Sequence, residues 1–326
     1  VADLATARFE LAGTGPSNSG GLAISGSAPP YTTATEEWTG AGTVEIGTWA
    51  TTGNLNDGRS IMGGAGTGVA TGLMFGGSPP TTANTESYNG TNWTEVNNLN
   101  TARAALAGAG TATAALGFGG SPAPNSALTE TWNGTNWTEV NDMNDGRNSL
   151  RGAGTSTAAL GTGGYAPSLT GKTELWNGSN WTEVNDLNTS RAYMGMGGTS
   201  TSAIVAGGSP PSRNEAESWN GTNWTETGNL NEARYFLGGT GASNTDSLVF
   251  GGSPTPGAIT AKTEKWNGSS WTEQSDLNTP RAAMGASGNS STTALSAGGE
   301  NPGSSALEAT EEWTIPGKVG KTISTD

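Results

Sequence analysis

The sequence predicts an all-β protein, a seven-bladed β-propeller whose blades are four-stranded antiparallel sheets. The first observation behind this prediction is a unit that recurs seven times along the 326 residues, at spacings of 43 to 51 residues. A period in this range is typical of propellers and solenoids. The second is that short segments of alternating side-chain character, separated by Gly, Pro and Asn, fill each unit, with no competing helical period. The third is that very small residues and Trp occupy different, fixed places in the unit.

The third unit shows how four strands, A to D, follow from the residues. Strand A is expected in 104–110 (AALAGAG) and strand B in 111–120, which ends in a Gly pair. Strands C (129–132, TETW) and D (137–140, WTEV) flank Asn133-Gly134, a strong hairpin signal. Four antiparallel strands per repeat form a propeller blade. Small residues in strand A and Trp in the outer strands suit a wedge that widens away from the axis.

We assign residues 1–326 to a single propeller. The expected blades are 1–52, 53–96, 97–140, 141–184, 185–227, 228–274 and 275–326. The two end units depart from the pattern. Trp38 and Trp49 are eleven residues apart instead of five, and the last unit has Trp313 but no second Trp, so that 319–326 would have to supply its strand D. This arrangement predicts closure by packing of the first blade on the seventh; a shared closing blade stays open as the alternative.

Each unit also carries one Arg before strand A and one Glu two residues before the aromatic residue of strand C. The Arg residues are Arg8, Arg59, Arg103, Arg147, Arg191, Arg234 and Arg281. The Glu residues are Glu36, Glu86, Glu130, Glu174, Glu217, Glu264 and Glu311. We interpret the two sets as structural partners within or between blades, because a site rarely needs seven copies of one residue. A ring of binding or catalytic Arg is the functional alternative.

Composition excludes several classes of function. The net charge of −14 argues against a nucleic-acid partner, because an acidic surface repels phosphate. The chain has no Cys and no His, which removes the commonest general base and metal ligand. The acidic loop 142–146 lacks the ligands of a calcium loop. We therefore expect no catalytic residues, no cofactor and no metal, and no membrane insertion, since no apolar run approaches about 18 residues.

The recurring order of Arg, a small apolar strand, a Gly pair, Glu-x-aromatic and a Trp five residues later resembles the kelch repeat, over essentially the whole chain. Kelch-like copper radical oxidases use His and a Cys-linked Tyr, which this chain lacks. The stretch WNGSNWTEVNDLNTSR (176–191) is similar to kelch-like repeats in structural proteins of marine bacteriophages, especially tail or virion-surface proteins. This resemblance implies a non-enzymatic role in virion architecture or host attachment at the virion surface.

The partners implied by that resemblance are other virion or surface proteins and a host-surface glycan or protein, and the oligomeric state stays open. The alternative function is a secreted bacterial adhesin or lectin-like module, which would be extracellular or on the cell surface. The loops between strands B and C vary most among the units, and binding residues commonly lie in loops on a rigid scaffold. Their candidate binding side chains are Tyr31, Tyr165, Lys172, Arg213 and Lys262. Unconstrained loops would show the same variation.

Overall fold

A computed structural model describes residues 47–121, 125–209, 211–303 and 305–315 with their side chains, and residues 12–17, 20–24 and 35–39 by their backbone alone. The chain separates into two compact units, Val1–Ile46 with Lys318–Asp326, and Gly47–Gly317. In the first unit, β1 (Ala12–Ser17), β2 (Gly20–Ile24) and β3 (Thr35–Thr39) pair in the order β1-β2-β3. Among the described segments there is no helix with the length and apolarity needed to cross a membrane.

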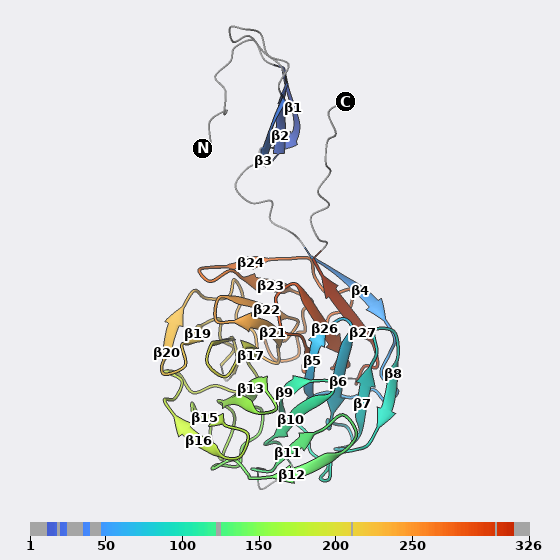
Figure 1. Cartoon of the computed structure of the whole chain (residues 1–326), viewed down its shortest axis with the longest axis vertical. Helices are drawn as coiled ribbons and strands as arrows, with labels where there is room; N and C mark the ends of the chain where they lie inside the picture. Colours follow the sequence, from blue (N-terminus) through green and yellow to red (C-terminus); the bar gives the residue numbers. More distant parts are fainter. Residues whose placement is uncertain are drawn as a thin grey trace. The chain divides into compact units, whose positions relative to one another are not determined.

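The second unit is a β-propeller of six four-stranded antiparallel sheets, arranged in a ring with strand A of each sheet nearest the centre (Figure 1). Blade 1 has β5 (Gly63–Gly68), β6 (Thr71–Phe75), β7 (Thr85–Tyr88) and β8 (Trp93–Val96), and blade 2 has β9 (Ala107–Thr111), β10 (Ala114–Phe118), β11 (Thr129–Trp132) and β12 (Trp137–Val140). Blade 3 has β13 (Arg151–Thr155), β14 (Ala158–Thr162), β15 (Thr173–Trp176) and β16 (Trp181–Val184), and blade 4 has β17 (Gly195–Gly198), β18 (Ala203–Ala206), β19 (Ala216–Trp219) and β20 (Trp224–Thr227). Blade 5 has β21 (Gly238–Ser243), β22 (Asp246–Phe250), β23 (Thr263–Trp266) and β24 (Trp271–Glu273), and blade 6 has β25 (Gly285–Ser287), β26 (Thr293–Ala297), β27 (Thr310–Thr314) and β4 (Thr48–Thr52).

The propeller and its four-stranded blades are confirmed, but the prediction of seven blades is wrong. The last sequence repeat supplies only three strands of blade 6. β4, which comes from the first sequence repeat (1–52), completes the blade by pairing with β27 (Figure 1). The register places Trp49 opposite Trp313, the pairing that Trp132 and Trp137 make inside blade 2. The ring therefore closes through a shared blade. The wide Trp38 to Trp49 spacing has a simple cause, because β3 and β4 belong to different sheets.

The inner strands consist mostly of small residues because neighbouring blades touch there through their backbones. A Cβ added to Gly108 in β9 would lie 2.3 Å from the carbonyl oxygen of Gly64 in β5. No side chain fits at that distance, so Gly permits the close approach. The outer strands diverge, and Trp and Phe fill the widening space between blades. Phe118 of blade 2 meets Trp181 of blade 3 with ring centroids 4.8 Å apart.

A hydrogen bond from each strand D Trp also joins neighbouring blades. The indole Nε1 of Trp181 donates to Thr129 Oγ1 of blade 2 at 3.0 Å, and four other blades repeat this bond. In blade 4, Ala216 stands where the others have Thr, and Trp271 of blade 5 donates instead to the carbonyl of Gly228. A buried Trp N–H finds an acceptor in every blade, as expected from the cost of leaving it unpaired.

We expect Thr129→Val to lower the free energy of unfolding by about 1–3 kcal/mol, because it keeps the side-chain shape and leaves the buried Trp181 N–H without an acceptor. Urea unfolding of the variant measures this loss. Thr138→Val, at an exposed position on the neighbouring strand, is the matched control. Equal unfolding free energies for the two variants would contradict the assigned role of the bond.

Candidate functional site

The repeated Arg and Glu form buried ion pairs inside each described blade. In blade 2, Arg103 Nη2 lies 2.7 Å from Glu130 Oε1, and Arg103 Nη1 donates to the carbonyls of Gly119 and Leu128. The second carboxylate oxygen accepts the backbone N–H and the Nδ2 of Asn100, each at 2.8 Å. The cluster therefore ties the connection between two blades to the ends of strands B and C.

The same pair recurs around the ring at N···O distances of 2.5–2.9 Å, with every side chain at most 2 % exposed. The pairs are Arg59–Glu86, Arg103–Glu130, Arg147–Glu174, Arg191–Glu217, Arg234–Glu264 and Arg281–Glu311. Burial lowers the pKa of Arg103, and its paired Glu130 carboxylate opposes that shift. Groups enclosed in this way offer no surface to a ligand. Arg8 and the side chain of Glu36 lie outside the described residues.

The five candidate binding residues do not form one cluster. Tyr165 and Lys172 belong to blade 3, Arg213 precedes β19 of blade 4, and Lys262 precedes β23 of blade 5. Tyr31 lies outside the described residues. Tyr165 is 41 % exposed, the highest exposure of a large hydrophobic side chain in the part of the chain that has described side chains.

The three cationic candidates, Lys172, Lys262 and Arg213, are each paired with nearby acidic side chains. Lys172 Nζ lies 2.5 Å from Asp145 and 3.2 Å from Glu183, and the bonds to these carboxylates raise the pKa of Lys172. Lys262 Nζ lies 3.5 Å from Glu232 and from Glu273. Arg213 Nη1 is 3.8 Å from Glu215. None of the three stands as an isolated charge, so Tyr165 is the strongest anchor for a ligand among the described candidates.

A surface hollow of ≈ 640 Å³ surrounds Tyr165, and Asn125, Asp145, Asn148 and Pro167 are among its lining residues. It lies between blades 2 and 3, on the face that carries the B–C loops and the connections between blades, here called the B–C face. Asn125 Nδ2 donates to the Tyr165 carbonyl at 2.7 Å, and Asn148 Nδ2 donates to Asn125 Oδ1 at 2.6 Å. These bonds fix the two amides beside the exposed ring.

The sequence analysis did not identify Asn125, Asp145 and Asn148 as lining residues of this hollow. A comparison of the repeats does, however, single out two positions of the hollow, Asn148 and Tyr165. The backbone bridge between Asn148 and Tyr165 is repeated in the other blades by residue pairs such as Ser60 and Ser78, or Ala192 and Ser209. Four of the other blades have Ser where blade 3 has Tyr165, and four have a small residue where it has Asn148; the exceptions are Glu300 in blade 6 and Tyr235 in blade 5. The repeat keeps its backbone there and changes only the side chains.

A second unusual region is the axial channel, whose B–C-face end is closed by a ring of hydrogen bonds. The residue two positions after each repeated Arg has a positive φ of 48–58°. Its N–H donates to the equivalent carbonyl of the neighbouring blade at 2.7–3.0 Å, six times around the ring. The residues are Ile61, Ala105, Ser149, Tyr193, Phe236 and Ala283. The cavity that they line measures only ≈ 10 Å³, so the channel is nearly shut at this end.

Within the part of the chain that the structure describes, no group of three or more acidic, His or Cys side chains is placed to hold a metal ion. Comparison with known proteins assigns no relationship: no protein-family model matches the chain, and no curated protein shows significant similarity to it. The Tyr165 hollow and the repeat itself are the features of this chain that bear on its function.

Proposed function

We propose that this protein is a non-enzymatic, kelch-like binding propeller and that the Tyr165 hollow binds a glycan. The observation that carries the proposal is an exposed aromatic ring, Tyr165, set beside the amides of Asn125 and Asn148 and the carboxylate of Asp145 in one concave site. The flat, apolar side of a sugar ring packs on an aromatic face. Its hydroxyl groups exchange hydrogen bonds with amide and carboxylate groups.

Two properties of the hollow favour a ligand of this size and polarity. Its ≈ 640 Å³ fall within the range of about 300–1,000 Å³ typical of small-molecule sites, in which a few fixed polar groups set orientation. The bonds that Asn125 and Asn148 already make hold those groups in place before a ligand arrives. Less side-chain entropy is then lost on binding.

We further propose a place for the protein on a bacteriophage particle, at the tail or capsid surface, where it would contact other virion proteins and a host-surface glycan. This placement rests on the similarity of the repeat sequence, as in residues 176–191, to the repeats of kelch-like phage proteins. In the alternative placement, a secreted bacterial adhesin, the same hollow would bind the glycan. Neighbouring genes distinguish the two placements, because tail and capsid genes favour the first and secretion or surface-anchor genes favour the second.

The binding proposal predicts that Tyr165→Ser weakens glycan affinity at least tenfold, because the substitution removes the ring on which the sugar packs. A glycan array would identify the ligand, and isothermal titration calorimetry would measure its affinity for both proteins. Ser is the residue found at the equivalent position in four other blades, so the backbone bridge to Asn148 is retained. The variant is therefore expected to fold normally.

Lys262→Ala, on the same face in blade 5, is the matched control and should leave glycan affinity unchanged. Loss of binding in Lys262→Ala with full binding in Tyr165→Ser would move the site away from the hollow. Failure of any glycan to bind would reject the proposal. Turnover of the bound glycan, detected by mass spectrometry and abolished by a single substitution, would show an enzyme instead.

A further inference from the structure

The axial channel holds one charged side chain where five blades have none. Arg151 is the first residue of β13, and the equivalent residues four positions after the repeated Arg are Gly63, Ala107, Gly195, Gly238 and Gly285. A Cβ at this position would lie 2.4 Å from the paired Phe75 in blade 1 and 2.3 Å from the paired Phe250 in blade 5, so these blades have Gly. Blade 3 has the smaller Thr162 opposite and carries a long cationic side chain. The packing of the other five blades provides no reason for a charge there.

Arg151 reaches across the channel to two other blades. Its Nε donates to the carbonyl of Met194 at 2.6 Å, just before β17 of blade 4, and its Nη2 donates to the carbonyl of Leu237 at 3.2 Å, just before β21 of blade 5. Its Nη1 makes no hydrogen bond to any described protein group. The guanidinium is thus held from one side by neutral carbonyls and keeps a free N–H edge.

No carboxylate balances this charge within the described residues. The cavity below Arg151 measures ≈ 60 Å³ and is lined by Gly, Ala, Leu and Met besides Arg151 itself. Burial lowers the pKa of Arg151 to about 10, so that the group still carries its charge at pH 7. Arg151 is partly buried, and a partly desolvated cation without a counter-ion is costly unless an anion or water accompanies it.

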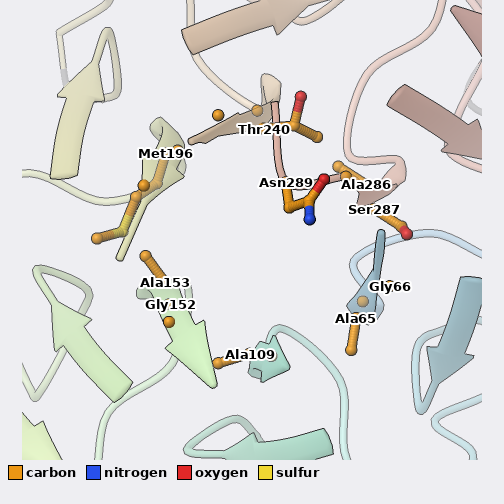
Figure 2. Close-up of a pocket in the computed structure, with 18 of the residues that line it drawn as sticks. Ala65, Gly66, Ala109, Gly152, Ala153, Met196, Thr240, Ala286, Ser287 and Asn289 are labelled. Atoms are coloured by element: carbon orange, nitrogen blue, oxygen red, sulfur yellow. The ribbon is translucent and has the colours of Figure 1, made fainter. Parts of the chain in front are cut away.

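The channel provides both space and access for a small anion. The ≈ 60 Å³ cavity continues into a second one of ≈ 90 Å³, since both are lined by Gly64, Gly108, Gly152 and Met196. Figure 2 shows side chains that surround the second cavity, among them Ala65, Ala153, Thr240 and Asn289. A cavity of about 10–15 Å³ is enough for one water molecule, so a halide fits easily.

The entry lies at the end of the channel opposite the B–C face. The ring of six backbone hydrogen bonds nearly shuts the B–C-face end, whereas the second cavity reaches the A–B turns through Asn289. Strand A is the innermost strand of its sheet, and alternate N–H groups on such an edge point away from strand B. Backbone N–H groups of the inner strands can therefore join Arg151 in binding an anion.

We propose that the axial channel is a binding site for a chloride-sized monovalent anion, held by the free edge of Arg151 and by inward-facing backbone N–H groups of the inner strands. The anion would neutralise the one charge on the axis and would stabilise the contact that Arg151 makes among blades 3, 4 and 5. This site is separate from the Tyr165 hollow and does not depend on the glycan-binding proposal.

Bromide, a heavier substitute for chloride, is the probe that tests this site. Crystals of the full chain grown in sodium bromide should show an anomalous peak beside the Arg151 guanidinium. In solution, bromide should raise the thermal unfolding midpoint above that in sodium gluconate of equal ionic strength, because gluconate is too large for the cavity. Crystals of Arg151→Ala grown in the same way should lack the peak. The apparent affinity of this variant for bromide should be at least tenfold lower than that of the wild type.

Arg151→Ala should fold, because Ala107 occupies the equivalent position in blade 2. Arg151→Lys is the second variant and should keep part of the bromide effect, since it retains the positive charge. Absence of the peak in the wild-type crystal would overturn the proposal. A peak or a bromide shift of the same size in Arg151→Ala would also overturn it, because binding would then be independent of the guanidinium.

Discussion

Glu130→Ala is expected to lower the free energy of unfolding by about 3–5 kcal/mol, because it leaves a buried charge without its partner. Arg103 is fully enclosed and lies 2.7 Å from the Glu130 carboxylate. The same substitution removes the acceptor of the Asn100 backbone N–H and side chain. One carboxylate therefore satisfies three groups that join blades 1 and 2. Urea unfolding followed by Trp fluorescence would measure the loss.

Glu139→Ala is the matched control for this prediction. Glu139 lies directly opposite Glu130 in the same β-hairpin, but its side chain is exposed. Exposed substitutions of this kind usually change stability by no more than about 0.5 kcal/mol. If both variants unfold at the same urea concentration, the buried pair does not stabilise the blade. A ring of binding or catalytic Arg residues would instead predict altered binding or turnover with unchanged stability.

Removal of residues 1–53 is expected to abolish cooperative unfolding of the propeller, whereas removal of residues 1–46 should preserve it. The first truncation deletes β4, the outermost strand of blade 6. It exposes the edge of β27 and removes Trp49, which packs on Phe250 at 4.8 Å and on Trp313 at 5.5 Å between ring centroids. Loss of a buried Trp side chain alone typically costs about 3–5 kcal/mol. Loss of the hydrogen bonds between β4 and β27 adds to that cost in stability.

Circular dichroism during heating would compare the two truncated chains. The chain that begins at Gly47 is the control, because it keeps β4 and all six sheets. A peptide of residues 47–53, added to the chain that lacks them, should raise its unfolding midpoint by restoring the strand. A seven-bladed ring would give the opposite result for the control, since removal of 1–46 would delete most of a blade and open the ring.

The closing strand also explains an unusual tyrosine. Tyr88 stands at the strand C position that Trp occupies in other blades, and its hydroxyl donates to Glu312 Oε1 of blade 6 at 2.6 Å. Burial, together with this bond, raises the pKa of Tyr88 to about 12. The hydroxyl also contacts Thr52 at the end of β4. The junction of blades 6 and 1 thus has a hydroxyl–carboxylate bond, whereas the equivalent Trp132 of blade 2 donates its indole N–H to the carbonyl of Ala112 within its own blade.

Local patterns of the sequence were enough to predict the blade. The turn after Trp132 follows from Asn133 and Gly134: the Asn133 side chain accepts the N–H groups of Thr135 and Asn136, and Gly134 has a positive φ of 92°. Small residues in strand A and Trp in strands C and D follow from the wedge shape. The absence of His and Cys is likewise a property of composition alone.

The candidate sites were only partly accessible to that reasoning. Tyr165 could be predicted because it is an aromatic residue in a variable loop. Asn125 and Asn148 could not be grouped with it, because Asn125 belongs to another blade and Asn148 to a connection between blades. Arg151 interrupts a run of small residues in the sequence. That its charge lies in the axial channel is evident only once the strand is placed beside the axis. Distances between loops of different blades depend on the closed ring, and no local pattern encodes them.

The sequence by itself determined the repeat, the four-stranded antiparallel blade and the distribution of small and large residues within it, because alternation and turn chemistry act over a few neighbouring residues. The tertiary structure decided the number of blades, the closure of the ring and the grouping of side chains around Tyr165 and Arg151. The physical reason is that an edge strand accepts any partner with matching hydrogen-bonding groups. The free edge of β27 is filled by β4, from the opposite end of the propeller sequence, and this pairing makes seven repeats into six blades.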